Sequence, residues 1–190
     1  MRFLLIVVGN GGHARVVVDM ARILDHTIAG ICDPAFPEGE VGPFGLTLLG
    51  DDSAIMDYRT DTVRLVIAIG SNQRRRDIFR SFKDRGYGFF SLVHPSAIIA
   101  TDVVLGEAVQ VMAGVIVQPN TVVGHNTILN TGCQIDHDCT VGDHVHIGPG
   151  AVLCGNVVVE SEALVGAGSV IAPGSRVKSG TIVRAGSVFV

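Results

Sequence analysis

The hydrophobic and polar positions of this chain follow two different patterns, one before residue 94 and one after it. From Pro95 to Val190 the sequence divides into sixteen consecutive six-residue units without an insertion. The fifth place of every unit is apolar, the third is small or β-branched, and the second is Gly, Asn or Asp in twelve of the sixteen. A period of six is typical of short strands joined by regular corners, and it fits neither a helix nor a long alternating strand.

Each place in the unit has its own role in such a coil. One large and one small inward side chain fill a narrow core, and valine and isoleucine favour the short strands. Gly, Asn and Asp tolerate the positive φ that corners need. Three units close one triangular coil, so residues 18 apart are expected to stack. The pattern therefore predicts a parallel β-helix for residues 94–190. A β-sandwich would not hold a six-residue phase over this length.

Residues 1–93 instead alternate buried apolar runs with amphipathic segments, which predicts a small α/β domain with a parallel sheet. Residues 34–46, after the second strand, are rich in Pro and Gly and are expected to form a loop. Strands are expected at 3–8, 27–32, 65–69 and 89–93, and helices from the glycine loop to about Leu24, at 51–58 and at 73–85.

The loop Gly9-Asn10-Gly11-Gly12-His13-Ala14 joins the first strand to the first helix and matches the dinucleotide fingerprint. In that fingerprint backbone N–H groups hold a diphosphate, and Asp33 at the end of the second strand would accept from a ribose or base. The plainer alternative is a tight strand–helix turn. A full dinucleotide domain has two such halves, whereas residues 1–93 have room for one. We therefore predict a Rossmann-like domain that binds a nucleotide-sugar in preference to NAD, with His13 near the ligand.

Charge and cysteine content exclude several classes of partner. The net charge is −4, which gives no reason to expect nucleic acid or an acidic membrane surface. No apolar run approaches the roughly 20 residues that span a bilayer. The four cysteines lack metal-ligand spacing, so we predict no metal and a reduced, cytoplasmic protein. A group of arginines without interleaved aromatic residues is interpreted as a solvated helix face: Arg74, Arg75, Arg76, Arg80 and Arg85.

Among the histidines of the repeats, His137 has carboxylates on both sides, Asp136 and Asp138. Such neighbours can fix the tautomer and raise the basicity of an imidazole, which suits a general base near neutral pH. An acyl transfer needs such a base. The alternative for any corner histidine is a solvated turn residue. His146 follows nine residues later, half a coil away, so we expect it on a different side of the prism, where it would meet His137 only across neighbouring copies.

The segments GNGGHA, IAIGSN, VHPSA and NTGCQIDHDCTVG together resemble one bacterial family of sugar acetyltransferases. That family includes N-acetyltransferases of nucleotide-linked 4-amino-4,6-dideoxy sugars and sialic acid O-acetyltransferases. The resemblance covers nearly the whole chain. It implies a left-handed β-helix, a homotrimer and acetyl-CoA as the co-substrate.

By this resemblance His137 is the catalytic base and Asp138 orients it. His146 is expected near the thioester of acetyl-CoA, with Ala167 and Ala185 along the coenzyme groove. The residues that would hold the nucleotide-sugar are Gly11, Gly12, His13, Asp33 and Gly70, with Asn130 near the acceptor. Members of the family usually continue past the last coil with a Gly-x-Pro-Ala segment that helps hold the coenzyme. The sequence reaches Val190 and does not include such a segment, so its affinity for the coenzyme is expected to be lower.

The predicted function is transfer of acetyl to the amine of a UDP- or GDP-linked amino-deoxy sugar, for a surface polysaccharide or glycan. An O-acetyltransferase that acts on sialic acid is the close alternative, because no residue separates an amine from a hydroxyl acceptor. A non-catalytic, trimeric nucleotide-sugar-binding scaffold is the alternative of another class. A nicotinamide-dependent oxidoreductase is disfavoured by the small first domain.

Overall fold

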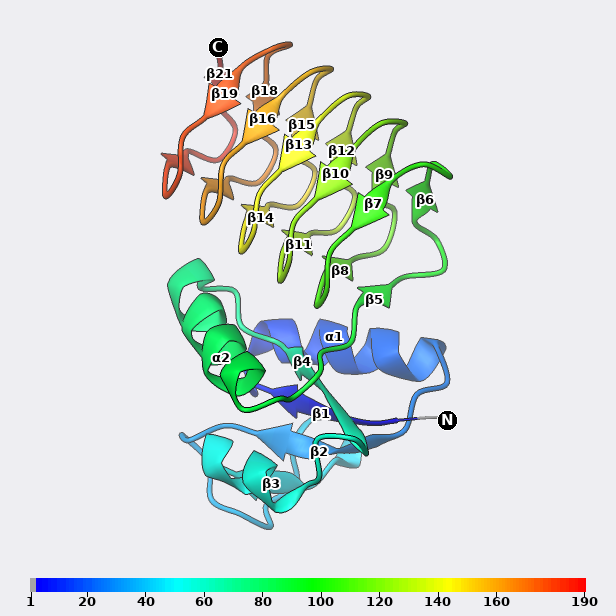
Figure 1. The fold of residues 1–190 in the computed structure, drawn as a ribbon, viewed down its shortest axis with the longest axis vertical. Coiled ribbons are helices and arrows are strands. Elements are labelled where there is room, and N and C mark those ends of the chain that lie inside the picture. Colours follow the sequence, from blue (N-terminus) through cyan, green and yellow to red (C-terminus); the bar gives the residue numbers. More distant parts are fainter. Residues whose placement is uncertain (1–2) are drawn as a thin grey trace. The chain divides into compact units, whose positions relative to one another are not determined.

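The computed structural model describes residues 3–190, and the chain divides into two units, one ending at Phe90 and the other beginning at Ser91 (Figure 1). The predicted strand at 89–93 does not form as one element. Phe89 makes a single parallel bridge to Leu65. Strand β5, Leu92–Val93, pairs instead with strand β8, Gln110–Val111, so the second unit begins earlier than the predicted residue 94.

The first unit is built on a four-stranded parallel sheet with the order β3-β2-β1-β4. Its inner strands are continuous apolar runs that are buried from Leu5 to Val8 in β1 and from Gly30 to Cys32 in β2, as a sheet covered on both faces requires. The sequence pattern missed β3, which is short and contains glycine. The strands are β1 Leu4–Val8, β2 Ile28–Cys32, β3 Leu48–Gly50 and β4 Val63–Ile67.

Helices connect and cover these strands. Helix α1, Gly12–Ile23, buries an apolar face that includes Val17, Val18 and Ala21. Two 3₁₀ turns follow, η1 at Pro43–Gly45 and η2 at Asp52–Asp57, and the Asp51 carboxylate caps η2 by accepting from the Ser53 N–H. Helix α2, Asn72–Asp84, begins after Ser71, whose hydroxyl accepts from the Arg74 N–H. Short polar caps thus fix where η2 and α2 begin, whereas η1 begins at Pro43 without a side-chain cap.

The second unit is a left-handed parallel β-helix, as predicted (Figure 1). Its two-residue strands form three sheets, and each strand pairs with the one 18 residues along, for example Val122 with Thr140. The β5 sheet holds β5, β8, β11 Ile128–Leu129, β14 His146–Ile147, β17 Leu164–Val165 and β20 Ile182–Val183. The β6 sheet holds β6 Ile98–Ile99, β9 Ile116–Val117, β12 Gln134–Ile135, β15 Val152–Leu153, β18 Val170–Ile171 and β21 Val188–Phe189. The β7 sheet holds β7 Val104–Leu105, β10 Val122–Val123, β13 Thr140–Val141, β16 Val158–Val159 and β19 Arg176–Val177.

The places of the repeat have the roles that the pattern predicted. The fifth-place side chains of the middle coils are buried, as are the small third-place residues such as Cys133 and Cys139. From residue 107 onward the second place has a positive φ in all fourteen units, even where it is Ala108, His144 or Glu162. The corner therefore imposes its conformation on residues that do not favour it.

Within residues 3–190 no helix is long and apolar enough to cross a membrane. The same part of the chain brings no three histidine, cysteine or acidic side chains together in a way that could hold a metal ion.

Candidate functional site

A pocket of about 380 Å³ and a second of about 270 Å³ lie in the first unit, and the second of these is formed by the glycine loop. We call it the glycine-loop pocket. It lies where β1 and β4 end and α1 begins, the usual place for a ligand in a parallel α/β sheet. The residues predicted to hold a nucleotide-sugar all line it. Its lining is Gly9, Asn10, Gly11, Gly12, His13, Asp33, Ala68, Ile69, Gly70 and Arg74.

The positions of this loop are occupied by glycine for different physical reasons. Gly9 has a φ of +105°, and a Cβ there would lie 2.9 Å from the Ile69 side chain, so the turn requires glycine. At Gly11 and Gly12 an added Cβ would meet no atom within 4 Å. Both therefore leave open space next to the N-terminal N–H groups of α1, which favour an anion such as a diphosphate.

The Asp33 carboxylate has a structural task in this pocket. One oxygen accepts from the Asn10 N–H at 2.8 Å and the other from the Ala35 N–H at 3.0 Å. It therefore ties the glycine loop to the end of β2. Contact of Asp33 with a ribose or base stays a prediction.

The interpretation of the five arginines as a solvated face is wrong for Arg75, whose side chain is fully buried. Its guanidinium donates to the carbonyls of Ile69 and Gly70, each at 3.2 Å, and to Asn72 Oδ1 at 2.8 Å. Burial lowers the pKa of Arg75 to about 10. Arg74, one position earlier, lines the glycine-loop pocket. Sequence reasoning missed both roles, although the arginines directly follow the Gly70 loop.

Replacing Arg75 with methionine is expected to destabilise the first unit by about 2–4 kcal/mol, because buried carbonyl groups lose their donor. Urea unfolding followed by circular dichroism measures the change. The matched control is Arg80→Met on the same helix, where the side chain is exposed and a change within about 0.5 kcal/mol is expected. Equal effects of the two substitutions would contradict the structural role of Arg75.

Replacing Gly12 with alanine is expected to move stability and binding in opposite directions. Gly12 is the first residue of α1, where alanine stabilises a helix by up to about 1 kcal/mol. The new methyl group would occupy the space that a diphosphate needs against the backbone, so affinity for a nucleoside diphosphate should fall about tenfold or more, which is about 1.4 kcal/mol. Thermal unfolding and calorimetric titration check both signs. Unchanged affinity would place the ligand elsewhere.

His137 lies at the corner between β12 and β13 in the second unit, beside Asp138. Its Nδ1 is 2.7 Å from Asp138 Oδ2, and its backbone N–H donates to Asp136 Oδ1 at 2.8 Å. The positive φ of Asp138, 60°, comes from its place in the repeat. One coil earlier, Asn120 Nδ2 donates to Asp138 Oδ1 at 3.1 Å. The stacked corners therefore hold the carboxylate that holds the imidazole.

The charges around His137 suit a base. Its pKa is raised, first by the hydrogen bond to Asp138 and then by the charge of Asp136. The pKa of Asp138 is lowered, first by the hydrogen bond with His137 and then by Asn120. The imidazole side chain is 53% exposed. Since Asp138 engages Nδ1, Nε2 is the nitrogen that can take a proton from a substrate.

Gly155 is a neighbour of His137 that the sequence reasoning missed. It stands 18 residues later, one coil along, and an added Cβ would lie 2.8 Å from Cε1 and 2.9 Å from Nε2 of the imidazole. The ring thus lies directly over this glycine. The 18-residue spacing could have placed Gly155 one coil from His137, but only the structure shows that the imidazole turns toward it.

A second group of predicted residues follows a different edge of the prism, where the β5 sheet ends. Asn130 Oδ1 accepts from the Thr131 N–H at 2.8 Å, so its Nδ2 donates to His146 Nε2 at 3.0 Å. Ala167 and Ala185 are exposed and stack on the same corner, where the Gly186 N–H donates to the Ala167 carbonyl at 2.9 Å. Four residues predicted near the acceptor and the coenzyme are therefore placed along one edge.

The structure does not bring the two edges together within one chain. His137 and Asp138 follow the β6 sheet, whereas Asn130 and His146 belong to the end of the β5 sheet. The β6 sheet separates them, as expected for residues half a coil apart. A site that uses both groups needs a second copy of the β-helix.

Comparison with known protein families gives two matches. Residues 4–82 match the PglD N-terminal domain, and residues 120–155 match the bacterial transferase hexapeptide of six repeats. A curated relative, UDP-N-acetylbacillosamine N-acetyltransferase from Bacillus subtilis, is 34% identical over 110 residues, which are 56% of this chain. The match spans half the length of that relative.

Solved structures resemble the chain over almost its full length. Perosamine N-acetyltransferase from Caulobacter crescentus, as a point variant in complex with CoA and GDP-perosamine, is 37% identical with a TM-score of 0.93. The similarity covers 98% of this chain and 88% of that one. The acetyltransferase domain of PglB from Neisseria gonorrhoeae, in complex with acetyl coenzyme A, is 32% identical with a TM-score of 0.92, covering 100% of this chain and 92% of that domain.

Proposed function

The chain belongs to the family of hexapeptide-repeat sugar acetyltransferases with a PglD N-terminal domain, and on that basis we propose that it acetylates the amine of a nucleotide-linked amino-deoxy sugar. The observation that carries the proposal is the imidazole of His137, which is held at Nδ1 by Asp138 and is half-exposed. The product would enter a surface polysaccharide or glycan.

In this reaction His137 acts on the acceptor. Acetyl-CoA supplies an acetyl group activated as a thioester. As the sugar amine forms a bond to the acetyl carbon, His137 Nε2 takes the proton that the amine loses. The C–S bond then breaks and CoA leaves as a thiolate. The positive charge of the protonated imidazole balances the negative charge of this thiolate. Asp138 keeps Nδ1 protonated and stabilises the imidazolium. The small side chains of Ala167 and Ala185 leave room for the coenzyme along their edge.

The glycine-loop pocket holds the nucleotide in this proposal. The N-terminus of α1 and the side chain of Arg74 together favour the diphosphate, and Gly11 and Gly12 leave space for it. Gly70 and His13 complete the lining. The pocket does not by itself choose between UDP and GDP.

A homotrimer supplies the second copy that the two separated edges require. Valine side chains on the outer face of the β7 sheet support an interface, because Val104 and Val122 are 57% and 45% exposed. Cross-linking and light scattering test the assembly. Full activity in a monomeric species would contradict a site shared between copies.

We place the protein in the cytoplasm, where acetyl-CoA is made. Its four cysteines carry no disulfide within the described residues, and three of them are buried. A reducing compartment agrees with this state.

The pH dependence of kcat/KM should depend on Asp138. A raised His137 pKa means that the imidazole is protonated, and inactive as a base, over a wider range at low pH. Activity should therefore fall as pH drops through that raised pKa. In Asp138→Asn the carboxylate no longer supports the imidazolium, so the pKa falls and the acid limb should move to lower pH. A pH–rate profile that does not move would argue against this hydrogen bond in the reaction.

The decisive test of the function is CoA release measured with purified nucleotide-linked 4-amino-4,6-dideoxy sugars and with sialic acid. We expect release with the amino sugars and none with sialic acid. Release with sialic acid alone would identify an O-acetyltransferase. Clear nucleotide binding without release for any acceptor would identify the non-catalytic scaffold.

A further inference from the structure

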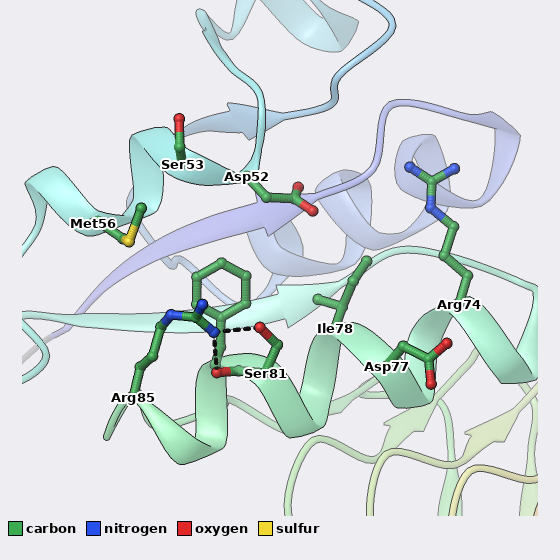
Figure 2. Close-up of a pocket in the computed structure, with 9 residues that line it drawn as sticks. Asp52, Ser53, Met56, Arg74, Asp77, Ile78, Ser81 and Arg85 are labelled. Carbon is green, nitrogen blue, oxygen red and sulfur yellow. Dashed lines mark hydrogen bonds between the residues drawn. The ribbon is translucent and has the colours of Figure 1, made fainter.

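Another pocket of the first unit, about 380 Å³, lies between η2 and α2 (Figure 2). We call it the η2–α2 pocket. Arg74 lines both this pocket and the glycine-loop pocket, so the two hollows adjoin at that side chain. The residues that line it are Asp52, Ser53, Met56, Arg74, Asp77, Ile78, Ser81, Phe82 and Arg85.

The walls of the η2–α2 pocket are mixed in character. Met56 extends from η2, and Ile78 and Phe82 come from the facing side of α2, so the pocket has apolar surface on both sides. Such surface suits a flat aromatic ring, which gains stabilisation by stacking on aromatic and apolar side chains. At the end near Arg74 the wall becomes polar, with the Asp52 carboxylate projecting from η2 (Figure 2).

Asp52 has an unused hydrogen-bonding atom. Its Oδ1 is buried and has no hydrogen-bond partner among the described residues. A buried acceptor in this condition costs free energy unless a ligand supplies a donor. Burial raises the pKa of Asp52, and the charge of Arg74 opposes that rise. Asp33, the acceptor expected from the sequence, already binds two backbone N–H groups.

A carboxylate distinguishes the bases by their donors. Guanine presents two adjacent donors, N1–H and the exocyclic N2 amino group, which one carboxylate can accept in parallel. Uracil and thymine present a single N3–H between two carbonyl oxygens, which a carboxylate repels. A site with a buried polar group strongly rejects an analogue that leaves that group unpaired.

We propose that the η2–α2 pocket binds the base of the nucleotide and that Asp52 makes the chain selective for a guanine nucleotide. This inference rests on the proposed function, since it assumes that the diphosphate occupies the glycine-loop pocket. The base then stacks between η2 and α2, Arg74 lies at the junction with the phosphates, and Asp52 accepts from the two guanine donors.

The test compares GDP with IDP, which differs only by lacking the exocyclic amino group. Calorimetric titration of the wild-type chain should give an affinity for GDP about tenfold or more above that for IDP and for UDP. In Asp52→Asn the preference for GDP over IDP should shrink to about twofold. Urea unfolding should show unchanged or higher stability, because the substitution removes a desolvated charge.

The matched control is Asp57→Asn, which makes the same change at the other end of η2, outside this pocket. It should keep the full preference for GDP over IDP. Equal binding of GDP and IDP to the wild type, an unchanged preference in Asp52→Asn, or tighter binding of UDP each overturns the inference. If one of these occurs while Gly12→Ala still weakens binding, the proposed function survives. If no nucleoside diphosphate binds, both fail.

Discussion

Replacing His137 with alanine is expected to lower kcat/KM for acetyl transfer at least about a hundredfold, which is the usual contribution of a general base. Asp138 holds the imidazole at Nδ1, which leaves Nε2 as the nitrogen that takes the proton. Alanine removes this nitrogen. Steady-state assay of CoA release measures the loss. Affinity for the nucleotide should not change, because the proposed nucleotide pocket lies in the first unit.

The matched control for this substitution is His125→Ala. His125 also occupies the first place of a six-residue unit, and it is exposed, but its Nδ1 accepts from the Glu107 N–H, whereas Nδ1 of His137 donates to a carboxylate. We expect kcat/KM within about threefold of the wild type, with a small loss of stability from the lost hydrogen bond. Near wild-type activity in His137→Ala would remove the proposed base.

Replacing Gly155 with alanine is expected to lower kcat about ten- to hundredfold while the β-helix stays folded. The added methyl group would lie within 3 Å of the His137 ring and push it from its place, and a displacement of about 1 Å can cost about a hundredfold in rate. Gly155 has no positive φ, so alanine meets no backbone strain. Circular dichroism and steady-state kinetics measure fold and rate.

A double-mutant cycle tests whether Gly155 acts through His137. In the His137→Ala background the Gly155→Ala substitution should have little further effect, because the ring that it displaces is absent. A full additional loss in that background would show that the glycine has a separate role.

The β-helix and the glycine loop were accessible from the sequence because their causes are local. Apolar fifth places, small third places and permissive second places recur every six residues, and a strand followed by Gly9 and Gly11 needs no distant partner to be identified. The fold and the family predicted from these patterns are confirmed. The catalytic role of His137 and the binding roles of the other site residues stay predictions.

Other features depended on contacts that no local pattern carries. Arg74, Arg75 and Arg80 look alike in sequence, yet the rotation of α2 on the sheet buries Arg75 under the Gly70 loop and leaves Arg80 in solvent. Strand β3 was missed because it is short, and it exists by pairing with β2.

The sequence by itself determined a prism of stacked coils with one histidine between two carboxylates, because a regular repeat of side-chain size and turn residues leaves the backbone few alternatives. Tertiary structure alone decided that Gly155 lies under that histidine and that Asn120 holds its carboxylate, because stacking brings residues 18 apart into contact. It likewise placed the unpaired oxygen of Asp52 opposite α2, because η2 crosses from β3 to β4. Packing determines which side chains meet across coils and helices, and the local sequence pattern does not specify those contacts.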